Sequence, residues 1–207
     1  METVHLERVY IVRHGETEYN ATGRWQGFLD VPLNDVGRRQ AAQLAEYLHA
    51  HSETIERIYT SDLIRARETA EIIAQSYGLE VQTETRLRET NVGIFQGLTN
   101  REIDAQYADI HYLWSNDDTY VIPDGESRLQ VQQRMMEVWH EWTRHLTLRH
   151  IMIVSHGGSI RWLLRGLFPH VDHSVYHVPN TSLSVVQRTE RGWHLDRAGT
   201  VAHLKQD

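Results

Sequence analysis

The chain has 207 residues and a mass of 24.2 kDa, with 40% hydrophobic residues, 24% charged residues and a formal net charge of -7 at pH 7. Cysteine is absent, which excludes disulfide bonds, iron–sulfur clusters and thiolate chemistry. Acidic and basic residues are interspersed, and no apolar run approaches the roughly 20 residues needed to cross a bilayer. We therefore expect neither nucleic-acid nor membrane binding. The N-terminal stretch METVHLERVY lacks the apolar core of a secretory signal, which favours a cytoplasmic location.

The first part of the chain alternates short apolar strands with amphipathic helices. RVYIV (8–12) is β-branched and aromatic, as expected of a buried strand. After a loop, Asn34 is expected to cap a helix from about 35 to 50, and RIYT (57–60) follows as a second strand. The predicted helix carries small and aliphatic residues on one face: Ala41, Leu44, Ala45 and Leu48.

The next predicted helix follows the second strand directly. Ser61 or Asp62 is expected to cap it and Gly78 to end it, and a short strand is expected around 80–85. The residues predicted to face inward are Ala66, Ala70, Ile73, Ala74 and Tyr77.

The second part of the chain begins with an irregular stretch, RLRETNVGIFQGLT. A helix near 100–107 is predicted to lead into the polar, aromatic segment YADIHYLWSNDDTY. A long helix from Glu126 to about Leu146 precedes a third clear strand, IMIVS (151–155), and a further helix starting GGSIRWLLRGLF. TSLSVVQRT and GWHLDRAGT are typical of two final strands that form an edge hairpin. The pattern that predicts the long helix comprises Leu129, Met136, Trp139, Trp142 and Leu146.

Strands that alternate with helices predict an α/β fold around a layered, mostly parallel sheet. Only 4 prolines occur, and the chain contains neither a low-complexity run nor a tandem repeat. The sequence thus predicts a single domain over residues 1–207.

Two nearly identical pentapeptides, IVRHG (11–15) and IVSHG (153–157), end two of the predicted strands. In open α/β sheets, ligands bind at the carboxyl ends of the strands. His14 and His156 both fall at that edge, and the glycine after each lets the chain turn sharply. A helix is predicted to start at Gly157-Gly158, and its free amides favour an anion.

Arginines are expected at the same edge. Arg13 precedes His14, and Arg65 lies with Arg67 in the first turns of the helix after the second strand. The helix dipole disfavours a cation there by about 0.3–1 kcal/mol, which a bound anion would offset. Two histidines, two arginines and a helix N-terminus fit a phosphoryl group, whose oxygens take donors in fixed positions.

Beyond this chemistry, RHGETEYN (13–20) resembles the defining motif of the histidine phosphatase superfamily, in the branch that contains the cofactor-dependent phosphoglycerate mutases. The resemblance covers most of the chain and implies a three-layer α/β/α sandwich. The other motifs that carry it, in order, are GRWQG with LDVPLNDVGRRQA (23–41), YTSDLIRARETA (59–70), LRETNVGIFQGLT (87–99), PDGES (123–127) and IVSHGG (153–158).

The resemblance implies a role for each matching residue. His14 would be the nucleophile that becomes phosphohistidine, and Glu89 would be the proton donor that later activates water. Gln26 and Gly27 fall where the family contacts the part of the substrate that is not transferred. The groups expected to hold the phosphoryl oxygens are Arg13, Arg65, His156, Asn20 and the amide of Gly157.

No metal or cofactor is expected, because arginines supply the positive charge. The nucleophile must be neutral, so its other ring nitrogen should donate a hydrogen bond. HVDHSVYH (170–177) places His173 and His177 at metal-ligand spacing, but without a paired acid in a strong pattern we interpret them as surface or supporting residues.

Phosphatase activity is favoured over mutase activity. The mutases of the family carry a lysine at the position of Asn100, a tyrosine at that of Val92, and a basic insertion near 108–120, where this chain has no Lys or Arg. Asp124 departs from the PGGES-like motif of the monophosphatases. The sequence therefore predicts a metal-independent phosphomonoesterase acting on a small phosphorylated metabolite, with the segment 99–127 as a cap over the site.

Two other functions are weighed against it. One is a cofactor-dependent phosphoglycerate mutase, and the other is a non-catalytic phosphoprotein-binding module. The low positive charge of the segment 107–120 argues against highly phosphorylated substrates. A homodimer is compatible with the sequence.

Overall fold

The computed structural model describes residues 5–204, apart from the side chains of residues 173 and 174. A six-stranded sheet in the order β3-β2-β4-β1-β5-β6 forms its centre. The neighbours β3, β2, β4 and β1 are parallel, β5 is antiparallel to β1, and β6 is antiparallel to β5. The strands are β1 (Arg8–Arg13), β2 (Arg57–Thr60), β3 (Val81–Thr83), β4 (His150–Ser155), β5 (Leu183–Thr189) and β6 (Gly192–Thr200).

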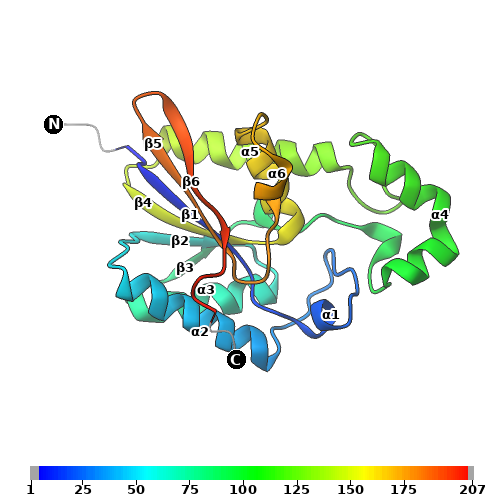
Figure 1. The fold of residues 1–207 in the computed structure, drawn as a ribbon, viewed down its shortest axis with the longest axis horizontal. Coiled ribbons are helices and arrows are strands. Elements are labelled where there is room, and N and C mark those ends of the chain that lie inside the picture. Colours follow the sequence, from blue (N-terminus) through cyan, green and yellow to red (C-terminus); the bar gives the residue numbers. More distant parts are fainter. Residues whose placement is uncertain (1–4, 205–207) are drawn as a thin grey trace.

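Helices cover both faces of the sheet, which gives three layers (Figure 1). The helices are α1 (Glu18–Ala21), α2 (Asp35–Ala50), α3 (Ile64–Tyr77), α4 (Asn100–Asn116), α5 (Arg128–His145) and α6 (Gly157–Leu167). Three short 3-10 turns are η1 (Thr85–Leu87), η2 (Gly93–Phe95) and η3 (His173–Tyr176). The predicted α/β fold, its mostly parallel sheet and the closing hairpin are confirmed.

Alternating side chains of the central strands build two separate cores. In β1, Tyr10 and Val12 pack under α2 and α3, whereas Val9 and Ile11 pack under α5 and α6. Successive side chains of a strand point to opposite faces, so a strand buried on both sides is apolar throughout. This explains why 8–12 is a continuous apolar run.

Two predicted features of α3 have different outcomes. Gly78 ends the helix in the left-handed conformation, with φ of 62°, as expected. The predicted cap by Ser61 or Asp62 is wrong, because Leu63 precedes the helix and makes no side-chain cap. Instead the amide of Ile64 donates to the carboxylate of Asp30, 2.6 Å away, from a loop that follows β1.

The helix predicted near 100–107 is longer than expected. α4 continues to Asn116 through a kink at Tyr107, whose φ is -139° and ψ is 33°. The residues that anchor it to a small third core lie at helical spacing: Ile103, Tyr107, Ile110 and Trp114. The surrounding polar residues obscured this spacing in the sequence.

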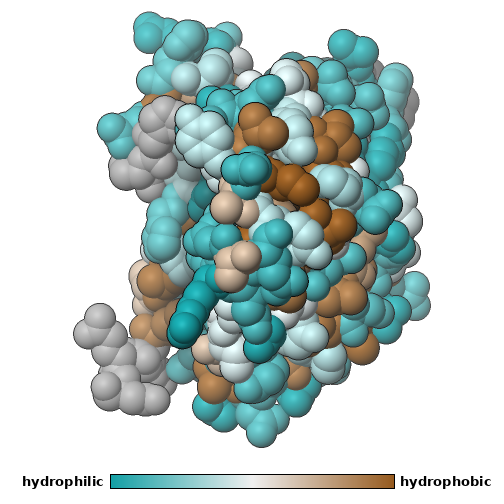
Figure 2. Space-filling model, turned by 90° about the vertical axis from the view of Figure 1, so that its right-hand side faces the viewer, coloured by the Kyte–Doolittle hydropathy of each residue, from teal (hydrophilic) through white to brown (hydrophobic). Residues whose placement is uncertain are grey.

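The 99–127 segment, which contains α4, lies at the end of the molecule away from the β5–β6 hairpin (Figure 1). Viewed from that end, hydrophobic side chains lie among hydrophilic ones (Figure 2). Tyr112 and Leu113 of α4 are exposed, and so is Leu129 of α5, one of the residues whose spacing predicted the long helix. Among the helices in residues 5–204, none is long and apolar enough to cross a membrane.

Candidate active site

The two histidines meet where the sequence placed them, at the carboxyl ends of neighbouring strands. β1 and β4 pair in register, with Arg13 beside Ser155, so the next residue of each strand reaches the same edge. The rings of His14 and His156 lie 5.1 Å apart between centroids, at an angle of 58°, and both are buried. His14 and His156 are 142 positions apart in the sequence, yet their rings lie next to each other in the fold.

His14 is held as a neutral imidazole with one free nitrogen. Its Nδ1 lies 2.7 Å from the carbonyl oxygen of Gly15, which can only accept, so Nδ1 carries the proton. Burial, and then the charges of Arg65 and Arg13, hold the pKa of His14 well below its usual value. The unprotonated Nε2 is therefore available as a nucleophile at neutral pH.

Glycine after His14 is required by a close approach of the backbone. A Cβ at Gly15 would lie 2.5 Å from the carbonyl oxygen of Gly37 in α2. The Gly15 amide in turn donates to Thr69 of α3 at 3.0 Å. These contacts fix the carbonyl that orients the His14 ring.

His156 lies deeper and is unsatisfied. Neither of its ring nitrogens has a hydrogen-bond partner among the described residues, although both are buried. Burial, followed by the charge of Arg65, keeps the pKa of His156 well below its usual value. A buried polar group without a partner is costly, so this ring is ready to bind a ligand atom.

Arg65 and Arg13 are largely buried cations. Arg65 donates to the carbonyls of Leu29 at 2.7 Å and Gly27 at 2.8 Å, and Arg13 donates to that of Val178 at 2.7 Å. The Nε atoms of both arginines are buried without a partner, and neither arginine forms an ion pair within the described chain. Burial lowers the pKa of Arg65 to about 10, which leaves it charged at pH 7. Two buried guanidinium groups without an ion-pair partner thus lie at the carboxyl edge of the sheet.

Arg67, the other arginine noted near the start of α3, does not join this site. Its side chain is exposed and its Nε lies 3.6 Å from a carboxylate oxygen of Glu71, one turn along the helix. The expectation that a bound anion offsets the cost of a cation at the N-terminus of α3 therefore applies to Arg65 and not to Arg67.

Glu89 occupies the N-terminus of α6. Its carboxylate accepts from the amides of Thr90 at 2.8 Å, Ser159 at 3.1 Å and Gly158 at 3.2 Å. The expectation that α6 begins with amides open to an external anion is thus wrong for Gly158 and Ser159. The amide of Gly157 is not one of the three that donate a hydrogen bond to Glu89.

Asn20, Gln26 and Gly27 line the same cavity as His14, and each is held by a hydrogen bond. Asn20 uses its side-chain oxygen to cap α1, accepting from the amide of Thr17 at 3.2 Å, so its amide nitrogen is the group left for a ligand. Gln26 accepts from the Thr17 hydroxyl at 3.0 Å, and Gly27, with φ of 52°, offers its carbonyl to Arg65.

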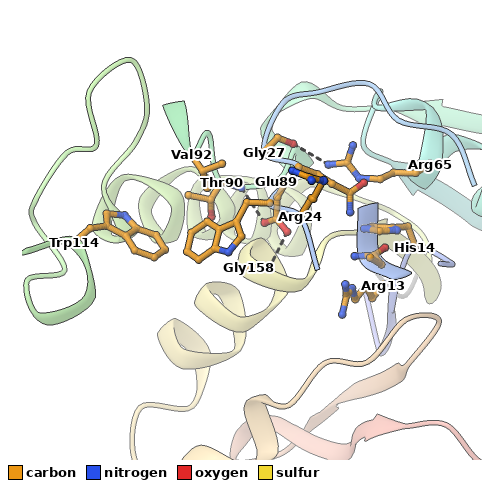
Figure 3. Close-up of a pocket in the computed structure, with 13 residues that line it drawn as sticks. Arg13, His14, Arg24, Gly27, Arg65, Glu89, Thr90, Val92, Trp114 and Gly158 are labelled. Atoms are coloured by element: carbon orange, nitrogen blue, oxygen red, sulfur yellow. Dashed lines mark hydrogen bonds between the residues drawn. The ribbon is translucent and has the colours of Figure 1, made fainter. Parts of the chain in front are cut away.

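A cavity of about 200 Å³ opens over these groups. Arg13, His14 and Arg65 gather at one end of it, Trp114 lies at the other, and Glu89 lies between them (Figure 3). Of the residues predicted for the site, His156 and Gly157 are not in its wall: His156 packs behind His14.

Several wall residues were not singled out from the sequence. They come from the loop after β1 and from the segment after β3: Arg24, Trp25, Thr90 and Trp114. Asn180 was also missed, and its amide nitrogen donates to the His14 carbonyl at 3.1 Å and to Asn20 Oδ1 at 3.2 Å. Arg24, Trp25 and Thr90 lie inside motifs quoted above, which was the available signal.

The fold and this cavity define an α/β protein with buried histidines and arginines at the carboxyl edge of its sheet. Residues 9–200 match the sequence profile of the histidine phosphatase superfamily (branch 1), and the chain belongs to this family. The resemblance noted in the sequence is thereby confirmed.

Individual relatives carry phosphatase and mutase-like names. The chain is 38% identical over 171 residues to a glucosyl-3-phosphoglycerate phosphatase of Mycolicibacterium vanbaalenii, covering 79% of this chain and 75% of the relative. It is 38% identical over 209 residues to phosphoglycerate mutase-like protein 4 of Arabidopsis thaliana, covering 99% and 90%.

Solved structures agree with this assignment. A mycobacterial glucosyl-3-phosphoglycerate phosphatase in complex with VO3 superposes with a TM-score of 0.81 at 34% identity, covering 94% of this chain and 99% of that one. YhfR of Bacillus stearothermophilus gives a TM-score of 0.84 at 30% identity, covering 95% and 98%.

Proposed function

We propose that the protein is a phosphatase that hydrolyses small phosphate monoesters through a phosphohistidine on His14. The observation that carries the proposal is the environment of the His14 ring: a neutral imidazole with Nδ1 bonded to a carbonyl, beside two arginines that lack a carboxylate partner. The family and the relatives named as phosphatases support it.

In the first step, Nε2 of His14 attacks phosphorus and the bond to the ester oxygen breaks. Glu89 serves as the proton donor to that oxygen, and an alcohol leaves. The three amides that Glu89 accepts from stabilise the carboxylate that this transfer produces. In the second step, the Glu89 carboxylate takes a proton from water as the water oxygen attacks phosphorus, and the N–P bond breaks to release phosphate and neutral His14.

Charge on the transferred group is balanced by the buried cations. The phosphoryl oxygens would take the free Nε–H groups of Arg13 and Arg65, a ring nitrogen of His156, the Asn20 amide and the Gly157 amide. The ligand would satisfy donors that are buried without partners in the structure, so binding removes their desolvation penalty.

Mutase activity is the second candidate, because relatives carry that name. Val92 lines the cavity without charge, and Asn100 accepts the indole N–H of Trp25 at 2.7 Å. Neither position supplies a cation that would hold a bisphosphate intermediate while it reorients. These two positions favour hydrolysis over mutase activity. The presence of both a candidate nucleophile, His14, and a candidate proton donor, Glu89, argues against a non-catalytic phosphoprotein-binding module.

The test is phosphate release in the presence of EDTA from p-nitrophenyl phosphate, 3-phosphoglycerate and sugar monophosphates. We expect release by the wild type and by His140→Ala, which alters an exposed histidine of α5, and none by His14→Ala. Acid-labile phosphohistidine should be trapped only when His14 is present. Interconversion of phosphoglycerates primed by 2,3-bisphosphoglycerate, without hydrolysis, would make the protein a mutase. Failure to form phosphohistidine would refute both enzyme functions.

A further inference from the structure

A second groove adjoins the cavity, between the 99–127 segment and the helices α5 and α6. Its volume is about 540 Å³, and it shares Trp25, Thr90, Trp114 and Gly158 with the cavity over His14. The two spaces therefore adjoin each other at these four residues. A substrate whose phosphoryl group lies over His14 would extend its remaining part into this groove.

Arginines of α5 and α6 line the groove with little acidic compensation. Arg128 and Arg165 share one carboxylate, that of Asp118, at 3.4 and 3.5 Å. Arg161 has no carboxylate within 4 Å in residues 5–204, and its Nε donates only a long bond of 3.4 Å to the Tyr176 carbonyl. In a chain of net charge -7, this local positive excess indicates a site for an anion.

The remaining acid in the wall does not cancel this excess. By formal charge, Arg128, Arg161 and Arg165 outnumber Asp104, which lies 2.6 Å from Nδ1 of His111, and the shared Asp118 by one. Of the three arginines, Arg161 is the one without a carboxylate within 4 Å in residues 5–204.

Tryptophans hold the other two arginines in place and supply one more donor. The guanidinium of Arg128 lies 4.2 Å from the ring of Trp114, and that of Arg165 lies 4.7 Å from the ring of Trp162. Such stacking fixes a guanidinium group without neutralising it. The indole N–H of Trp114 is buried and has no partner in the described chain. A ligand oxygen in the groove would satisfy it.

Helix α6 connects this groove to the phosphoryl site. Gly158, whose amide binds Glu89, is followed at positions three and seven residues later by Arg161 and Arg165. Residues at this spacing lie on one face of a helix, so a single face runs from the proton donor to the arginines. Arg161 is also close enough to Arg13 to act on its pKa, which burial lowers and Glu89 raises.

We propose that this groove binds a second anionic group, carried by the leaving part of the phosphate monoester, with Arg161 as its main contact and the Trp114 N–H as a second donor. The inference rests on the proposed phosphatase function and narrows its substrate class to monoesters with one further anionic group. The sequence suggested little positive charge near the site because the 107–120 segment has none; the arginines come from α5 and α6 instead.

The experiment compares esters that differ only in the second anion. One pair is 3-phosphoglycerate and glycerol 3-phosphate, and the other is 4-carboxyphenyl phosphate and phenyl phosphate. The readout is the ratio of kcat/KM within each pair for the wild type, Arg161→Gln and Arg161→Lys. Arg191→Gln, in the exposed turn between β5 and β6, removes the same charge far from the groove and serves as the matched control.

We expect the wild type to prefer the carboxylate ester in at least one pair by about tenfold or more, the effect of one charge-assisted hydrogen bond. Arg161→Gln should abolish that preference through KM, with kcat/KM for the uncharged ester changed less than about twofold, whereas Arg161→Lys should keep part of it and Arg191→Gln all of it. No preference in either pair, or a preference that survives Arg161→Gln, would overturn the subsite and leave the phosphatase proposal standing.

Absence of hydrolysis with every ester would instead refute the proposed function. Calorimetric titration of the wild type with the same two pairs then tests the groove by itself. Tighter binding of the carboxylate member that is lost in Arg161→Gln supports the subsite, and equal binding of both members overturns it.

Discussion

At the scale of single residues, Arg65 and Arg67 show how burial decides the role of a charge. They lie two positions apart in α3, yet one is fully buried without a carboxylate and the other is exposed beside Glu71. An exposed helical ion pair contributes about 0.3–0.5 kcal/mol. A buried cation that is held by backbone carbonyls and has no ion-pair partner carries a desolvation cost, which a bound anion reduces.

Replacement of Arg65 by lysine tests this difference. Lysine cannot donate to both Leu29 and Gly27 and still present a planar N–H group to the ligand, so Arg65→Lys should lower kcat/KM by about 10- to 100-fold. It should also lower Tm, because buried carbonyls lose their donors. Arg67→Lys is the matched control and should change kcat/KM less than about twofold. Equal losses in the two variants would show that the guanidinium of Arg65 has no special part in binding.

Gly158 permits the contact between α6 and Glu89. A Cβ there would lie 2.5 Å from Oε1 of Glu89 and 2.9 Å from the hydroxyl of Thr90, so Gly158→Ala should displace the carboxylate. We expect kcat to fall by about tenfold or more with little change in Tm. Gly166→Ala, further along the same helix, would meet only the flexible side chains of Met136 and Gln132 and should keep wild-type kcat. Steady-state kinetics and thermal melts of both variants decide between these outcomes.

Local motifs predicted the identity of the central groups but not their partners. His14, Arg13 and Arg65 each lie in a contiguous motif at the end of a strand or the start of a helix, and Glu89 lies in a contiguous motif of the irregular segment after η1. Two of the three donors to Glu89 belong to α6, and Asn180 donates to the His14 carbonyl. Such pairings depend on packing between distant segments, which no local pattern encodes.

At the scale of elements, one side chain of α5 fixes the loop that carries Glu89. Arg134 donates to the carbonyls of Arg86 and Arg88 at 2.7 Å and of Glu89 at 2.8 Å, and its Nε pairs with Glu126 at 2.9 Å. Arg134 is thus a positioning residue, since it acts on the substrate only through Glu89. The five donors of a guanidinium suit this task and the three of an ammonium do not.

Arg134→Lys should therefore lower kcat more than it changes KM. Loosening of the Glu89 loop misplaces the proton donor while the phosphoryl-binding arginines stay in position, so we expect kcat to fall by about 10- to 100-fold and KM to change less than threefold. Arg144→Lys, in the exposed last turn of α5, is the control. A merely structural role would lower Tm and the active fraction without altering the pH profile of kcat for the folded enzyme. An unchanged kcat would refute the positioning role.

Elements with a complete local signal were predicted well, and those that need a distant partner were not. The strands at 57–60 and 151–155 and the cap by Asn34 agree with the structure to within a residue. The start of α3 did not, because its first amide is satisfied by Asp30 from another loop. Leu129 fits the helical spacing of α5, but it lies in the first turn of the helix and stays exposed. Tertiary context overrides local pattern in both cases.

At the scale of the whole molecule, the site makes the fold sensitive to acid. His14 and His156 are buried beside arginines, and burial and these charges keep the pKa of each well below its usual value. In the unfolded chain both would titrate near 6.5. Below that pH the unfolded state binds protons that the folded state does not, so stability is full above pH 6.5 and falls as the pH drops.

The free energy of unfolding should therefore fall between pH 6.5 and pH 5. His14, His156 and His203, whose pKa burial lowers to about 4, together give a slope of up to about 4.1 kcal/mol per pH unit, of which about 2.7 belongs to His14 and His156. The carboxylates whose pKa values are lowered, among them Glu53 and Asp62, add their losses only nearer pH 4, so this window isolates the histidines. Urea unfolding of the wild type and of a His14→Gln/His156→Gln variant at several pH values measures it. The double variant should show a flatter dependence of the free energy of unfolding on pH, because it keeps no proton-binding difference at these positions.

Inorganic phosphate should raise the urea midpoint of the wild type at every pH, since it binds the folded arginines and not the unfolded chain. A double variant with the full wild-type slope would assign the acid sensitivity to groups elsewhere in the fold.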